Sequence, residues 1–136
     1  MPKNQPLIKL TTESDVYVVK YNADGNYLMT GHADRTVRLW NAKKGVLVKT
    51  YEAVQNREVF DIAIFQDNGR FASCGGDKTF FLWDVLTGKY IRKITAHMSK
   101  INTLALNPQQ NLIATGSFDN TVKIWDILNP QQFKPV

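Results

Sequence analysis

The stretch GSFDNTVKIWDI at residues 116–127 decides the fold of this chain, because two other stretches repeat its pattern. They are GHADRTVRLWN at residues 31–41 and GGDKTFFLWDV at residues 75–85. In each of them an aspartate in a turn precedes an apolar run that ends on tryptophan. Trp40, Trp83 and Trp125 stand 43 and 42 residues apart. A period of about 40 to 45 residues is typical of repeated small sheets.

The segments around the tryptophans repeat as well. An apolar run precedes each phrase, at residues 16–21, 59–65 and 101–106, and a polar turn follows each run, at residues 22–26, 66–70 and 107–111. The middle unit divides into four expected strands at 59–65, 71–76, 80–85 and 89–94. Strands this rich in Val, Ile, Phe and Leu repay their ordering entropy only when both faces are buried, as in stacked sheets. The sequence therefore predicts an all-β fold of three four-stranded antiparallel units, at residues 11–51, 52–94 and 95–136.

These phrases resemble WD40 repeats, and the resemblance covers residues 6–128, nearly the whole chain. It implies that residues 1–136 form a single segment of a β-propeller, in which each unit is one blade. It also implies a buried hydrogen-bonded network in each blade. The network joins a histidine before the first strand, a Ser or Thr on the second strand, the turn aspartate and the tryptophan.

Only the third unit has every member of this network, namely His97, Thr115, Asp119 and Trp125. The middle unit has Ser73, Asp77 and Trp83, with Val54 or Gln55 near the histidine position. The first unit has Thr30, Asp34 and Trp40, with Thr12 in that position. We therefore expect the first two blades to be tied less tightly at this turn. A buried aspartate needs donors and an indole N–H needs an acceptor, so Asp119→Ala is expected to destabilise the third blade.

Three units are too few for a closed ring, since propellers have about 4 to 8 blades. The segment PLIKL at residues 6–10 resembles a fourth strand and could pair with the third unit, whose own fourth strand would otherwise come from residues 131–136. Three explanations of the length remain open. The chain is part of a longer propeller, or it dimerises into a six-bladed ring, or another protein completes it.

Composition and spacing argue against catalysis. Ser73, His97 and Asp119 are the residue types of a catalytic triad, but they occupy repeated structural positions. His32 and Cys74 lie in different units and are too few for a metal site. With one cysteine and no long apolar segment, the chain is expected to be cytoplasmic or nuclear, with no cofactor, metal, enzymatic activity or membrane association.

Partner-binding residues are expected beside the turn aspartates, on the strand-connecting face that WD40 proteins generally use for docking. Phe118 is the sharpest candidate, since the other units have Ala33 and Gly76 there. Arg35 and Lys78 follow the aspartate and suit an acidic partner or phosphopeptide. Further candidates are Asn120, and the aromatic residues Tyr17 and Phe60 near the starts of first strands.

Residues 24–51 and 75–94 are similar to the opening blades of the mitogen-activated protein kinase organiser group. This resemblance implies a scaffold for kinase cascades, and members of the group are also associated with spliceosomes. The expected function is thus a non-catalytic protein-interaction scaffold. The alternative is a WD-repeat subunit of an RNA-processing particle, in which the net charge of +5 would favour contact with RNA. This chain has fewer than half of the blades of that group, so surfaces on the other blades cannot be carried over.

Overall fold

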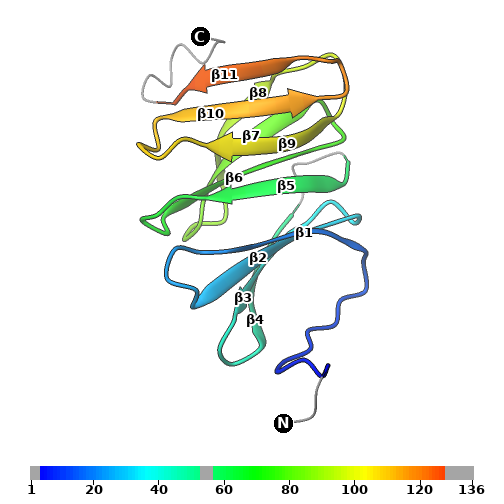
Figure 1. Ribbon diagram of the computed structural model, residues 1–136, viewed down its shortest axis with the longest axis vertical. Helices are drawn as coiled ribbons and strands as arrows, with labels where there is room; N and C mark the ends of the chain where they lie inside the picture. Colours follow the sequence, from blue (N-terminus) through cyan, green and yellow to red (C-terminus); the bar gives the residue numbers. More distant parts are fainter. Residues whose placement is uncertain (1–3, 53–56, 128–136) are drawn as a thin grey trace.

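The computed structural model describes residues 4–52 and 57–127, which form three antiparallel sheets stacked along the long axis of the molecule (Figure 1). The first sheet contains β1 (Val16–Tyr21), β2 (Tyr27–His32), β3 (Val37–Asn41) and β4 (Val46–Tyr51). The middle sheet contains β5 (Val59–Ile64), β6 (Arg70–Gly75), β7 (Thr79–Asp84) and β8 (Tyr90–Thr95). The third contains β9 (Ile101–Leu106), β10 (Leu112–Ser117) and β11 (Val122–Asp126). The expected all-β class is confirmed.

Within each sheet the strands follow one another in chain order, joined by short turns. The register is the same in all three, because the tryptophan of the third strand pairs with the second residue of the second strand: Trp40 with Leu28, Trp83 with Phe71 and Trp125 with Ile113. The fourth strand expected for the third sheet, at residues 131–136, lies outside the described residues.

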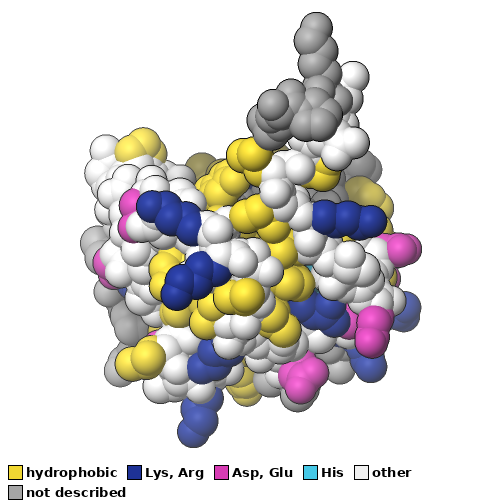
Figure 2. All heavy atoms as spheres, turned by 90° about the horizontal axis from the view of Figure 1, so that it is seen from below, with side chains coloured by type: hydrophobic (Ala, Val, Ile, Leu, Met, Phe, Trp, Pro, Cys, Tyr) yellow, Lys and Arg dark blue, Asp and Glu magenta, His cyan; other side chains and the backbone are white. Residues whose placement is uncertain are grey.

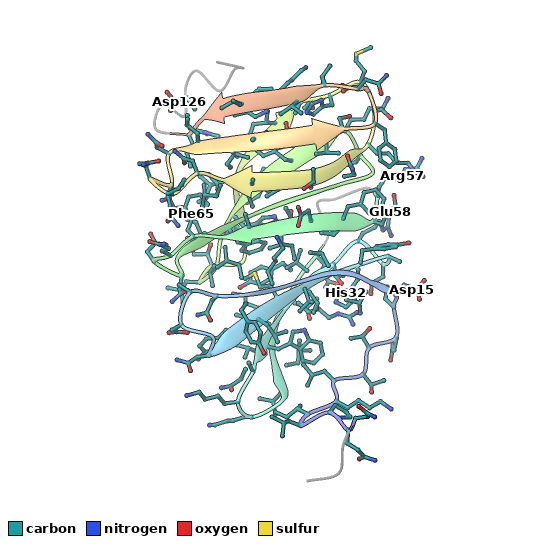
Figure 3. All side chains as sticks on the ribbon, in the orientation of Figure 1. Asp15, His32, Arg57, Glu58, Phe65 and Asp126 are labelled. Carbon is teal, nitrogen blue, oxygen red and sulfur yellow. The ribbon has the colours of Figure 1, made fainter. Side chains whose placement is uncertain are left out.

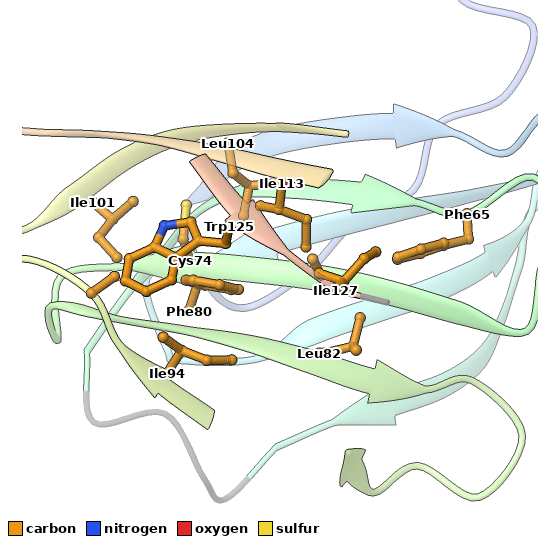
Figure 4. Packing of buried hydrophobic residues seen from close by; sticks show 12 residues of the cluster. Phe65, Cys74, Phe80, Leu82, Ile94, Ile101, Leu104, Ile113, Trp125 and Ile127 are labelled. Carbon is orange, nitrogen blue, oxygen red and sulfur yellow. The ribbon is translucent and has the colours of Figure 1, made fainter. Parts of the chain in front are cut away.

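The core lies between the sheets rather than within one of them. Between the first and middle sheets, Met29 and Val37 pack against Ile62, Phe71 and Trp83. Between the middle and third sheets a second cluster forms (Figure 4), whose buried members include Phe80, Leu82, Ile94, Ile101, Leu104 and Trp125. Apolar burial at about 25 cal/mol per Å² is the main stabilising term here, and it depends on each sheet having a neighbour.

The two outer faces of the stack are uncovered, and equivalent residues show this directly. The first strands of the three sheets, β1, β5 and β9, have Val19, Ile62 and Leu104 as their fourth residues. These side chains are 57%, 0% and 4% exposed, respectively. On the opposite face, Val37 and Phe80 are fully buried, whereas Val122 is 74% exposed. Seen from the end of the first sheet, hydrophobic side chains form a band with Lys and Arg around it (Figure 2). These outer faces have the composition of inter-sheet surfaces, but none of the sheets formed by residues 4–52 and 57–127 covers them.

The pairing of residues 6–10 with the third sheet, which the sequence left open, is not seen in this structure. These residues form no strand, and they lie against the β3–β4 turn of the first sheet. A Cβ atom on Gly45 would come within 2.8 Å of Ile8 Cγ2 and 3.6 Å of Leu10 Cδ2. The physical reason is distance, because the middle sheet separates the first sheet from the third (Figure 1).

Candidate functional site

The third sheet assembles four predicted network residues into a continuous chain of hydrogen bonds. The indole Nε1 of Trp125 donates to Thr115 Oγ1 over 3.0 Å, and His97 Nε2 lies 2.7 Å from the same hydroxyl. On its other side, His97 Nδ1 lies 2.9 Å from Asp119 Oδ2. Thr115 is only 1% exposed, so the hydroxyl satisfies two buried groups at once.

Asp119 closes this network at the turn before β11. Its carboxylate accepts hydrogen bonds from the hydroxyl and the backbone N–H of Thr121 and from the backbone N–H of Met98. The Thr121 hydroxyl is the main cause that holds the pKa of Asp119 well below its ordinary value, and the bonds from Met98 and His97 add to it. The carboxylate therefore stays ionised and ties the loop between β8 and β9 to the turn between β10 and β11.

The first sheet reaches a similar arrangement with a different histidine. Trp40 Nε1 donates to Thr30 Oγ1 over 2.9 Å, and His32 Nε2 lies 2.6 Å from that hydroxyl. His32 belongs to β2 itself, and Thr12, which the repeat places in the histidine position, instead bonds to Ser14. A histidine two residues after the strand threonine was the signal that sequence reasoning missed.

The burial of His32 distinguishes it from an ordinary surface histidine. Burial is the main cause that lowers the pKa of His32, and the nearby Arg38 guanidinium lowers it further. Arg38 itself pairs with Asp34 over 2.7 Å. The aspartate of the first sheet thus bonds to Arg38 and Thr36, whereas the equivalent Asp119 bonds to His97.

The middle sheet repeats the tryptophan contact, since Trp83 Nε1 donates to Ser73 Oγ over 2.9 Å. Asp77 Oδ1 accepts the backbone N–H of Thr79 over 3.2 Å. Val54 and Gln55, the candidates for the histidine position of this unit, lie outside the described residues. Ser73 is fully buried in the middle sheet, and His97 uses both ring nitrogens within the third sheet. The three triad-type residues therefore serve two separate networks.

Asp61 links all three sheets, and the sequence analysis did not single it out. Its Oδ2 accepts the backbone N–H of Leu104 and the hydroxyl of Thr103, each over 3.0 Å. Its Oδ1 lies 3.4 Å from Lys20 Nζ of the first sheet. The available signal was an acidic residue inside the otherwise apolar strand VFDIAIF.

The described residues contain no group of three or more His, Cys, Asp or Glu that could hold a metal ion. Cys74 is fully buried, and burial raises the pKa of its thiol well above the ordinary value. A thiol in this state is inert as a nucleophile and as a metal ligand. No helix within residues 4–52 and 57–127 has the length and apolar character that a membrane crossing requires.

One edge of the three sheets, which we call the turn face, carries the predicted partner-binding residues. At this edge β1, β5 and β9 begin, and the turns between the second and third strands lie beside them. Figure 3 shows Asp15, Arg57 and Glu58 on this side of the molecule, while Phe65 and Asp126 lie on the other. The structure brings Arg35, Lys78, Asn120, Phe118 and Tyr17 to the turn face, each of them exposed.

A left-handed backbone conformation marks the same three turns. Arg35, Lys78 and Asn120 follow the turn aspartates, with φ of 73°, 68° and 72°. Asparagine tolerates this left-handed region, but other residues with a Cβ pay roughly 1 to 2 kcal/mol for it. Two of the three turns therefore hold long cationic side chains where glycine or asparagine would be less strained.

Exposed hydrophobic side chains accompany these cations on the turn face. Phe118 is 59% exposed and Met98 is 82% exposed, and both lie next to Asp119, which accepts the Met98 N–H. Tyr17 of β1 packs edge-on against Phe60 of β5, with 5.4 Å between the ring centroids, yet Tyr17 remains 50% exposed. Exposed aromatic and cationic residues together are the composition of protein-binding hot spots.

The comparisons with known proteins agree with this geometry. The WD domain, G-beta repeat family matches residues 4–41, 45–84 and 88–126. This chain therefore belongs to the WD40 repeat family, and its three sheets are successive blades. The first match starts before PLIKL, so residues 6–10 correspond in sequence to the outer strands β4 and β8, although they form no strand in the structure.

Several relatives share this region. A WD repeat domain-containing protein 83 homolog from Dictyostelium discoideum is 34% identical over 122 residues, covering 86% of this chain and 37% of that protein. A guanine nucleotide-binding protein subunit beta from Arabidopsis thaliana is 33% identical over 122 residues, covering 83% and 32%. Autophagy-related protein 16 from Arabidopsis thaliana is 29% identical, covering 81% and 21%. The chain thus spans well under half the length of these relatives.

Proposed function

We propose that this chain is a non-catalytic scaffold that binds other proteins on its turn face. The observation that carries the proposal is the grouping there of exposed Phe118 and Met98 with Arg35 and Lys78, on a rigid frame of buried networks. A rigid platform suits docking because little conformational entropy is lost when a partner binds. The strain at Arg35 and Lys78 supports the same function, since the left-handed backbone disfavours these residues and a cation-binding partner would favour them.

The proposed partners are components of a kinase signalling cascade, and the supporting observation is the likeness of residues 24–51 and 75–94 to the kinase organiser group. A WD repeat domain-containing protein 83 homolog and a guanine nucleotide-binding protein subunit beta are among the relatives that match this region. Such a protein would act in the cytoplasm or the nucleus. The second candidate is an RNA-processing subunit, which the net charge of +5 favours.

The uncovered faces of the first and third sheets bear on how the scaffold is completed. We propose that they are covered in the working protein, by further blades, by a second copy of the chain or by another protein. Light scattering distinguishes these explanations. A mass of twice 15.5 kDa would indicate a self-completed six-bladed ring, and a poorly folded monomer or an aggregate would indicate that other blades or a partner are required.

Affinity purification from cells tests the proposed function. Wild-type protein is compared with Phe118→Ser, and with Leu86→Ser as a matched control, because Leu86 is an 85% exposed hydrophobic residue outside the turn face. The proposal expects a set of proteins that Phe118→Ser loses and Leu86→Ser retains. Kinases in that set would favour signalling, and splicing proteins released by nuclease or moderate salt would favour RNA processing. An identical set for all three proteins would refute the docking function.

A further inference from the structure

We propose a second docking site on the edge opposite the turn face, between the first and middle sheets, which binds a short acidic peptide through one aliphatic side chain. The site consists of two hollows that share Tyr27 as a common wall. One hollow is apolar and the other is flanked by lysines. This site is separate from the turn face, so it does not depend on the function proposed above.

The apolar hollow has a volume of about 210 Å³. Met29, Leu39 and Val48 line it from the first sheet, and Ile64 and Val85 line it from the middle sheet. Small-molecule sites are typically about 300 to 1,000 Å³, so a hollow of this size suits a single side chain better than a whole ligand. An aliphatic side chain that enters the hollow would remove its own apolar surface and that of the hollow from water, which favours binding.

Two asparagines, buried Asn22 and exposed Asn68, also line the apolar hollow. Asn22 Nδ2 donates to Asn68 Oδ1 over 3.2 Å, and Asn22 Oδ1 accepts the backbone N–H of Tyr27. Asn68 is exposed and has its own side-chain N–H groups to offer. Amide groups in the lining of an apolar hollow match the N–H and C=O groups of a peptide backbone, which favours a peptide over a lipid chain.

The adjoining hollow has a volume of about 280 Å³ and is lined by Asn26, Tyr27, Asn41, Lys43 and Lys44. Asn41 Oδ1 accepts the backbone N–H groups of both lysines, over 3.1 and 2.9 Å, which fixes the turn. Neither lysine takes part in an ion pair within the described part of the chain.

Asp24 is an acidic residue on which the charge of Lys43 acts: the hydrogen bond from the backbone N–H of Asn26 is the main cause that lowers the pKa of Asp24, and the charge of Lys43 adds to it. Its carboxylate already accepts the backbone N–H of Asn26 over 2.9 Å. Two lysines against one aspartate leave the hollow with a positive charge. Because Tyr27 borders both hollows, a peptide carboxylate next to the aliphatic side chain would lie close to Lys43 and Lys44, whose positive charge attracts it.

The site does not depend on how the propeller is completed. Every lining residue belongs to a strand or a turn of the first or middle sheet, and the packing of these two sheets against each other is already present in this chain. Further blades or a second copy would cover the outer faces of the stack and leave this edge open.

The test selects ligands from a phage-displayed library of random heptapeptides on the full 136-residue chain. The strongest peptide is then synthesised with a fluorescent label, and its Kd is measured by polarisation. Val48→Trp fills the apolar hollow, and Val46→Trp is the matched control, because Val46 lies on the same strand outside the hollow. The two valines are 52% and 49% exposed, so neither change disturbs the core. Equal melting temperatures would verify this.

We expect enriched peptides to carry Leu, Ile or Met next to Asp or Glu. Binding should weaken at least tenfold in Val48→Trp and in the double variant Lys43→Glu, Lys44→Glu, and it should be unchanged in Val46→Trp. The proposal is overturned if no peptide is enriched, if enriched peptides lack acidic residues, or if Val48→Trp binds as well as wild type. Peptides lost only in Phe118→Ser would also overturn it, while supporting the turn face as the docking site.

Discussion

Thr115→Val tests the buried network of the third blade most sharply, because valine has nearly the shape of threonine and leaves no cavity. The hydroxyl it removes accepts the Trp125 indole N–H and contacts His97 Nε2, and Thr115 is only 1% exposed. A buried polar group left without its partner costs roughly 1 to 3 kcal/mol. Two such groups predict a loss of at least about 2 kcal/mol in the free energy of unfolding.

The assay is chemical unfolding followed by far-UV circular dichroism, with Thr11→Val at an exposed position as control. A double-mutant cycle with Trp125→Phe isolates the indole contact. In that background the indole N–H is absent, so Thr115→Val should cost about 1 kcal/mol less than in wild type. A loss below about 0.5 kcal/mol for Thr115→Val, no larger than an ordinary surface substitution, would refute the reasoning.

Three further predictions follow from single positions. Gly75→Ala should destabilise the chain by about 3 kcal/mol or more, because its Cβ would lie 1.8 Å from the Glu58 carbonyl oxygen, whereas Gly69→Ala should melt like wild type. The pKa of His32 is lowered in the folded state. The contribution of neutral His32 to the free energy of unfolding is therefore complete above the unfolded pKa of 6.5 and is lost as the pH falls below that value. Melting temperatures between pH 8 and 5 should therefore drop less steeply in His32→Gln; an unchanged slope would contradict this. Lys78→Gly should be at least as stable as wild type, because glycine relieves the strain that Lys78 already bears at its φ of 68°, whereas the β-branched variant Lys78→Val should be less stable than wild type; equal losses in the two variants would exclude strain.

The repeat made the fold predictable, because three tryptophans with matching neighbours fix strand order, turn positions and stacking together. The segment KYIRKI at residues 89–94 was expected as a strand and β8 spans Tyr90–Thr95, a shift of one residue. At residues 6–10 the repeat pattern predicts a strand that the structure does not form. Their sequence matches an outer strand, but a strand forms only where a neighbouring sheet offers unpaired backbone groups.

The networks were predictable only where the residues keep the spacing of the repeat. His97 does so, whereas His32 reaches the equivalent threonine from inside β2, a contact that depends on side-chain packing at the strand end. Asp61 illustrates a second limit, because its partners Thr103 and Leu104 lie more than 40 positions away and become neighbours only after the blades stack. The exposure of Phe118 likewise follows from tertiary structure, since a turn phenylalanine can equally pack over a neighbouring blade.

The central claim is that the turn face is a protein-docking surface, and site-specific photo-cross-linking tests it most directly. A photoreactive phenylalanine analogue replaces Phe118 in one protein and Leu86 in another, since both positions are exposed, at 59% and 85%, and only the first lies on the turn face. Cross-linked proteins are identified by mass spectrometry after irradiation in cells. The account predicts defined partners cross-linked from position 118 and absent from position 86. Equal cross-linking from both positions, or none from position 118, would contradict it.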